Sequence, residues 1–221
     1  MQTLTEQLLD AGLADRVFSD ALLSRLLEGS SQRRYNLVNR AIKAGELIRL
    51  RRGLYMLPDK YRSKPCHPYA LAHMLVPGSY VSMETALSFH GWIPESVHTC
   101  VSVVPGRKSM NFRHEKMGLF TFHPLAIQKG YFLELVERVE LGGQALLMAN
   151  PLRALMDLVC FRKVEWQGLS WIEQGMRIDD AALATVTAAD IQSLKHVYKQ
   201  RRVLNFLNEF AAELRLELAN D

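Results

Sequence analysis

Residues 30–57 read SSQRRYNLVNRAIKAGELIRLRRGLYML, and this stretch decides the fold of the N-terminal part of the chain. Apolar residues at three- and four-residue steps around Val38 predict a helix, which Ser30 or Ser31 caps. Two short strands are expected to follow, over 46–50 and 54–57. The turn between them is predicted at Arg51, Arg52 and Gly53, where the glycine supplies an unusual backbone conformation.

The residues before this stretch complete a recognisable order of elements. Ser19 is a typical N-cap, and Gly29 a typical end, of a preceding helix. The apolar face of that helix is expected to consist of Ala21, Leu22, Leu23, Leu26 and Leu27. An earlier helix, over about 3–11, is expected to pack behind it. The sequence therefore predicts a winged helix-turn-helix domain over residues 1–60, a scaffold that places one helix in the DNA major groove.

The two faces of the second helix differ in chemistry. At about 100° per residue, the predicted buried stripe consists of Tyr35, Val38, Ala41 and Ile42. The opposite face and the wing carry side chains that suit base edges and phosphates. The candidate DNA-binding residues are Gln32, Arg33, Asn36, Arg40 and Lys43 on the helix and Arg49, Arg51 and Arg52 on the wing. The helix residues are expected to enter the major groove and the wing arginines to contact the backbone or the minor groove.

Positive charge is concentrated in the same region. Residues 31–64 contain ten basic and two acidic side chains, a net charge of +8, whereas the whole chain carries +4. A basic patch on a nearly neutral protein is typical of a DNA-binding domain. Two alternatives stay open, because a basic helix face can simply be solvated and winged helices also serve as protein-interaction modules.

Composition narrows the class of protein. The chain has 221 residues, of which 48% are hydrophobic, enough for one large or two small packed domains. No run approaches the roughly 18 apolar residues of a membrane span, and the N-terminus lacks the pattern of a signal peptide. Three widely separated cysteines (Cys66, Cys100 and Cys160) disfavour a disulfide framework. These features predict a protein of the reducing cytoplasm with no membrane partner.

Residues 61–221 are expected to form a second domain of mixed α/β structure, so the fold class is predicted to be α+β. The boundary between the two domains is expected within the polar, proline-rich segment over 58–68, as linkers often have this composition. Helices are predicted over 69–75, 82–90, from Pro151 onward, over 169–176, and as one long C-terminal helix over 188–218. Strands are predicted over 99–104, 119–123, 133–141 and 144–148, with 110–116 as a loop.

Three motifs, in this order, indicate a family. They are RRGLYMLP at 51–58, YVSMETALSFHGWIP at 80–94 and ANPLRALMDLV at 149–159. Over roughly residues 5–160 the chain resembles the AbiEi-type antitoxins, transcriptional regulators of bacterial type IV toxin–antitoxin systems; Trp92 departs from the smaller aliphatic residue usual in that family. The resemblance implies an N-terminal domain that binds inverted repeats in its own promoter, on double-stranded DNA. It also implies a C-terminal antitoxin domain that counters a nucleotidyltransferase toxin without a stable complex. Two copies are expected to associate on the repeat.

Other candidate sites are weaker. No phosphate-binding loop, dinucleotide-binding pattern or metal-ligand spacing is present, so no cofactor, metal or enzymatic activity is expected. An alternative remains a nuclease-like enzyme that docks through the winged helix, for which clustered acids would have to bind Mg²⁺. Glu84 with His90 is a further candidate carboxylate site. A second basic run (Lys195, His196, Lys199, Arg201 and Arg202) is interpreted as a solvated helix face or as a second binding surface.

Overall fold

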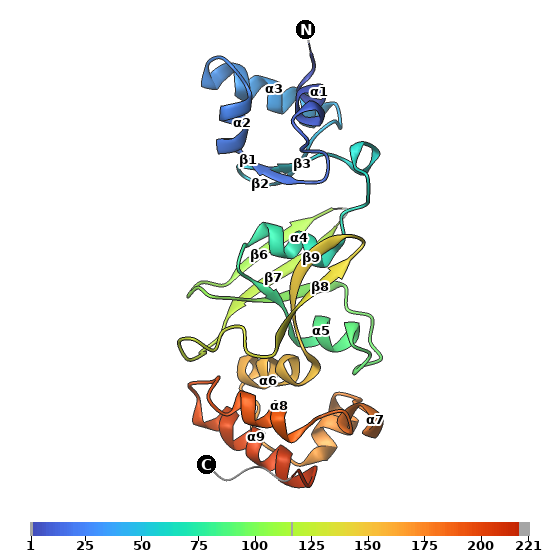
Figure 1. The fold of residues 1–221 in the computed structure, drawn as a ribbon, viewed down its shortest axis with the longest axis vertical. Helices are drawn as coiled ribbons and strands as arrows, with labels where there is room; N and C mark the ends of the chain where they lie inside the picture. The colour runs from blue at the N-terminus through green and yellow to red at the C-terminus, as the bar shows by residue number, and fades with distance from the viewer. Residues whose placement is uncertain (1, 116, 217–221) are drawn as a thin grey trace. The chain divides into compact units, whose positions relative to one another are not determined.

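The computed structural model describes residues 2–115 and 117–216 and has an α+β fold (Figure 1). It contains two compact units. The N-terminal unit comprises Met1–Leu75 together with Leu141–Gln144, and the C-terminal unit comprises Val76–Glu140 and Ala145–Asp221. The division after Leu75 differs from the boundary predicted after residue 60, because a 3₁₀ turn and a further helix belong to the first unit.

Helices and a small sheet build the N-terminal unit. Its elements are α1 (Leu4–Asp10), β1 (Val17–Ser19), α2 (Asp20–Leu26), α3 (Ser31–Lys43), β2 (Ile48–Arg51), β3 (Leu54–Met56), η1 (Asp59–Tyr61) and α4 (Pro68–Leu75). The three strands are antiparallel in the order β1-β3-β2. The sequence prediction included every one of these elements except β1 and η1. β1 is too short for a period-2 pattern, and its backbone pairing with β3 defines it instead.

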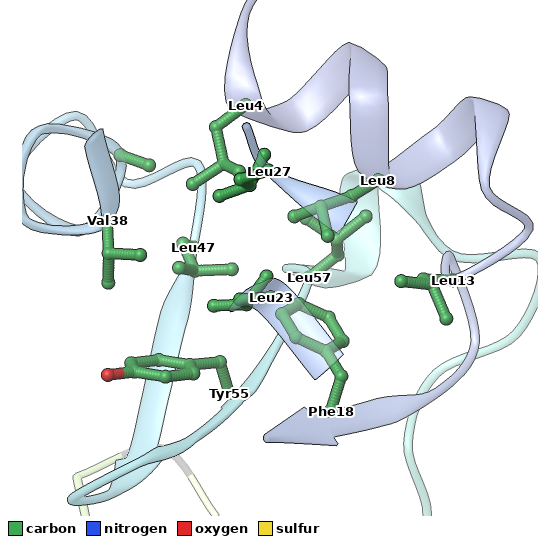
Figure 2. Packing of buried hydrophobic residues seen from close by; sticks show 11 residues of the cluster. Leu4, Leu8, Leu13, Phe18, Leu23, Leu27, Val38, Leu47, Tyr55 and Leu57 are labelled. Carbon is green, nitrogen blue, oxygen red and sulfur yellow. The ribbon is translucent and has the colours of Figure 1, made fainter. Parts of the chain in front are cut away.

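One hydrophobic cluster holds this unit together (Figure 2). It gathers buried side chains from the first three helices, from β1, from the hairpin and from the segments that connect them: Leu4, Leu8, Leu13, Phe18, Leu23, Leu27, Val38, Ala41, Leu47, Tyr55 and Leu57. The rings of Phe18 and Tyr55 lie 6.4 Å apart, and the Tyr55 hydroxyl points away from Phe18. Because α1, α2 and α3 share this core with the hairpin, the position of α3 beside the hairpin is fixed by packing.

The predicted helix starts are confirmed, whereas part of the predicted apolar stripe is wrong. Ser19 and Ser30 each accept a hydrogen bond from a backbone N–H in the first turn of α2 and α3, respectively. On α3, Val38 and Ala41 are buried, but Tyr35 is 63% exposed. Tyr35 shares its side of α3 with Ile42, but only Ile42, about two turns further along the helix, packs against the core. Leu22 of α2 is likewise exposed, since Leu23 and Leu27 fill the core side.

The C-terminal unit is built on a six-stranded mixed sheet in the order β6-β7-β5-β4-β9-β8. Its strands are β4 (Tyr80–Val81), β5 (Thr99–Val104), β6 (Met110–His114), β7 (Gly118–Pro124), β8 (Val136–Leu141) and β9 (Gln144–Ala149). β5 runs parallel to β7, and β4 runs parallel to β9. The predicted loop over 110–116 is wrong: β6 pairs antiparallel with β7 over Met110–His114. Its half-exposed edge position explains the polar composition that suggested a loop.

Helices make up the rest of this unit: α5 (Met83–Phe89), α6 (Pro151–Arg162), the π-helical turn η2 (Trp171–Gly175), α7 (Asp180–Leu183), α8 (Ala188–Leu194) and α9 (Arg201–Glu213). The predicted single helix over 188–218 is wrong, because residues 195–200 leave the helical path. Gln128 N donates to Val197 O at 2.7 Å and Lys199 N donates to Ala126 O at 2.8 Å. These backbone pairings interrupt the helix that the apolar spacing alone predicts.

Candidate nucleic-acid interface

The helix α3 presents polar and basic side chains opposite its buried face. All eight candidate DNA-binding residues are exposed: Gln32, Arg33, Asn36, Arg40, Lys43, Arg49, Arg51 and Arg52. Val38 and Ala41 fix the other side of the helix in the core. The sequence prediction of which face of α3 is solvated therefore agrees with the structure at these positions.

The turn of the β2–β3 hairpin is tied to the start of α2. Arg51 is the last residue of β2, so the turn consists of Arg52 and Gly53. Gly53 has φ +74° and accepts a 3.1 Å hydrogen bond from Asp20 N. The positive φ favours glycine at this position, and a Cβ there would lie 3.0 Å from Asp20 Oδ2, so the Asp20 side chain would have to move.

Side-chain contacts link several of the candidate residues. Gln32 Nε2 donates to Asn36 Oδ1 at 3.3 Å, which joins two amides along one face of α3. Arg49 Nη2 donates to Asn39 Oδ1 at 3.1 Å, which joins β2 to α3. Asn39 was not among the predicted site residues. A sequence signal for it is absent, because its role depends on the distance between strand and helix.

Two open hollows lie along α3. The larger, of about 810 Å³, is lined by α2, α3 and the hairpin and includes Asp20, Arg34, Arg52 and Tyr55. Burial, and after it the Asp20 carboxylate, raises the pKa of Tyr55, which keeps its hydroxyl protonated. The second hollow, of about 630 Å³, is lined by Tyr35, Asn36, Asn39, Arg40, Lys43 and Arg49. Tyr35, which was predicted to be core, lines both hollows.

One arginine in the basic segment is structural. Arg62 is buried and donates hydrogen bonds to the carbonyl oxygens of Ala14, Asp15 and Lys64. Ser63 reinforces this junction, because its N–H and hydroxyl both donate to the Asp15 carboxylate and lower the pKa of that carboxyl. The charge of +8 counted over residues 31–64 therefore includes a guanidinium that is not available to a ligand.

In the C-terminal unit, the structure does not bring Glu84 and His90 together as a site. Glu84 forms an ion pair with Arg162, and His90 Nε2 lies 3.0 Å from Ala149 O. The second basic run, over 195–202, does not form one exposed surface. Arg202 donates to the carbonyl oxygens of Val159 and Val164, where it satisfies the C-terminal end of α6.

The sequence prediction missed a buried polar network on α6. Arg153 and Asp157 have no exposed side-chain surface and form an ion pair with a distance of 2.9 Å between Nε and Oδ1. Tyr80, Ser82 and Tyr198 all donate their hydroxyl hydrogens to the Asp157 carboxylate, at 2.7–2.9 Å. Burial raises the pKa of both tyrosines well above the ordinary value.

This network is a structural element. Arg153 also donates to the backbone carbonyls of Glu134, Phe132 and Tyr131, so it links α6 to the segment before β8. Its members are closed to solvent, which leaves no room for a substrate among them. The spacing of Arg153 and Asp157, four residues apart on a helix, is the only trace of it in the sequence, and an exposed pair gives the same pattern.

No protein-family model matches the chain, and no curated protein is similar enough in sequence to count as a match. Within residues 2–115 and 117–216, no three His, Cys, Asp or Glu side chains are gathered as a metal site requires. In that same part of the chain, no helix has both the length and the apolar character needed to cross a bilayer.

Proposed function

We propose that the N-terminal unit is a winged helix-turn-helix that binds double-stranded DNA, with α3 as the recognition helix and the β2–β3 hairpin as the wing. One observation carries the proposal: α3 buries Val38 and Ala41 while its opposite, exposed face carries amide and cationic side chains beside a hairpin with three exposed arginines. Amide and guanidinium groups are the side chains that pair with base edges, and cations neutralise phosphates.

The proposed docking follows from these positions. α3 enters the major groove, and Arg52 at the hairpin turn contacts the sugar–phosphate backbone or the adjacent minor groove. The hairpin turn keeps its position because Gly53 is hydrogen-bonded to α2. Two copies bind an inverted repeat, one on each half-site.

The biological role extends this proposal through the resemblance to AbiEi-type antitoxins. The chain is proposed to repress its own operon in the bacterial cytoplasm and to counter a nucleotidyltransferase toxin, without a stable complex between them. The three motifs that carry the resemblance correspond to β2–β3, to β4–α5 and to the end of β9 with α6. The antitoxin activity is assigned to the C-terminal unit.

The test is a binding assay of the full chain on the DNA upstream of its own gene and on random DNA of equal length, at two salt concentrations. Tight, selective and salt-sensitive binding is expected, and the double variant R40A/R52A is expected to lose it. The matched control is R107A/K108A, which removes two exposed charges from the C-terminal unit and is expected to bind like the parent. Equal affinity of the parent for both DNAs would reject the repressor, and the N-terminal unit would then be a general docking module.

A further inference from the structure

The hollow lined by Tyr35, Asn36, Asn39, Arg40, Lys43 and Arg49 has a uniform chemistry. Three of these side chains are cations, two are amides and one is a phenol. Each can donate a hydrogen bond, and none carries a negative charge. The neighbouring, larger hollow differs because Asp20 lies in its lining. Three arginines (Arg34, Arg49 and Arg52) also line the larger hollow, where Asp20 offsets part of their charge. Only the smaller hollow combines three cations with no carboxylate, so it favours an anion more strongly.

The donors of the smaller hollow come from two elements. Arg49 lies on β2, whereas the other five residues lie on α3. The hydrogen bond from Arg49 to Asn39 Oδ1 holds the guanidinium next to the helix. It also orients Asn39, since an amide whose oxygen accepts from Arg49 has its NH₂ group left to donate.

The helix dipole explains part of this arrangement without any ligand. Arg40 and Lys43 lie in the last turn of α3, where positive charge is favourable for any helix. That effect does not account for a third cation brought in from a strand, nor for a 63% exposed tyrosine at the same place. Exposed apolar ring surface combined with clustered donors is typical of a binding site.

We propose that this hollow holds a phosphate group of the DNA backbone. The inference rests on the proposed function and assigns roles within it. Arg40 and Lys43, together with Arg49, bind phosphate and set the register of α3 on the duplex. Base reading is then left to the N-terminal end of α3, to Gln32 and Arg33, as in helix-turn-helix proteins whose recognition helix contacts base edges with its first residues.

The first test measures the affinity of the full chain for operator and random duplexes over a series of salt concentrations. The variants R40A, K43A and R49A are each expected to weaken binding to both duplexes by the same factor. Each should reduce the magnitude of the negative slope of log K against log salt by about 0.9, the value for one phosphate contact. The control variant R107A, an exposed arginine of the C-terminal unit, should leave the slope unchanged.

The second test uses duplexes in which one phosphate at a time is replaced by an uncharged methylphosphonate. At one position the parent should lose affinity, and the R49A variant should lose nothing further, as a double-mutant cycle requires for groups in contact. Additive losses at every position would overturn the phosphate site. So would R40A or K43A variants that change the ratio of operator to random binding while leaving the salt slope intact.

These outcomes separate the two proposals. If the parent protein binds DNA without selectivity, the repressor is refuted. The salt dependence and the methylphosphonate scan, both measured on a random duplex, still test the phosphate site. A parent protein that binds no duplex refutes both.

Discussion

Arg153 in the C-terminal unit and Arg40 in the N-terminal unit carry the same guanidinium group in opposite surroundings. Arg153 has no exposed surface and donates to a carboxylate, a phenol and three carbonyl oxygens. Arg40 is exposed on α3, at the edge of an open hollow. The first charge is fully neutralised inside the fold, and the second remains available to a partner.

The difference teaches how a charge pattern should be interpreted. A buried guanidinium has to be paired, because an isolated charge in the interior costs several kcal/mol. It therefore contributes to the specificity of one packed arrangement. An exposed guanidinium contributes little to stability, so a cluster of such groups beside a hollow points to a ligand. Variants of the two kinds should consequently affect different measurements.

The largest effect is expected for Asp157→Ala, which leaves the buried charge of Arg153 without its counter-ion. The free energy of unfolding of the C-terminal unit should fall by about 3–5 kcal/mol. Urea unfolding followed by tryptophan fluorescence measures this directly, because all three tryptophans (Trp92, Trp166 and Trp171) belong to that unit.

Two controls test the cause of that loss. The double variant R153M/D157L removes both charges and should lose less than Asp157→Ala alone. Arg177→Ala breaks an exposed pair with Glu95 and should leave the unfolding curve unchanged. A single variant D157A as stable as the parent would show that the network does not stabilise the fold.

A smaller effect is expected for Arg62→Ala, which tests whether this arginine of the basic segment stabilises the fold as Arg153 does. Charged hydrogen bonds of this kind contribute about 1.5–3 kcal/mol. Hydrogen exchange of amides in residues 2–57 should therefore accelerate, since Arg62 holds the turn before β1 to the chain that follows β3. The exposed Arg16→Ala should leave exchange unchanged. If Arg62→Ala and Arg16→Ala exchanged at the same rate, Arg62 would contribute no more to stability than an exposed arginine.

Gln32→Ala concerns recognition alone. If the first turn of α3 reads bases, this variant should lose about 1–3 kcal/mol of discrimination at one base pair, with its stability and salt slope intact. Selection from a randomised operator library would reveal the relaxed position. An equal loss of affinity for all DNA sequences would instead indicate that Gln32 contacts the sugar–phosphate backbone of the DNA.

How much of this follows from the sequence depends on the range of the interactions. The caps at Ser19 and Ser30, the glycine turn at position 53 and the solvated face of α3 depend on neighbouring residues, and all were predictable. The exposure of Tyr35 was not, because Tyr35 and Ile42 lie on the same side of α3 and only tertiary packing decides which of the two the core covers.

Features that depend on contacts between distant parts of the chain could not be predicted from the sequence. The contact between Arg49 and Asn39 depends on where β2 lies relative to α3. The break between α8 and α9 depends on backbone pairing with residues 126–128, about 70 positions earlier in the chain. The burial of Arg153 and Asp157 depends on hydroxyl groups from β4 and from residue 198. In each case the local pattern is compatible with a simpler element, and the distant partner changes the outcome.

The smallest effect is expected at His67, whose half-buried imidazole lies between the two extremes of exposure. Its Nδ1 accepts a 3.2 Å hydrogen bond from Tyr69 N at the start of α4, and burial lowers its pKa below the ordinary value of 6.5. The neutral form is thus favoured in the fold. The resulting stability is present above pH 6.5 and is lost as the pH falls from there towards the lower folded-state pKa, because the unfolded chain binds the proton first. The protection factors of the α4 amides, which correct for the intrinsic pH dependence of exchange, should fall across that window in the parent and stay constant in His67→Asn, whose side chain keeps an acceptor but does not titrate. The same fall in the variant would show that another group causes the pH dependence.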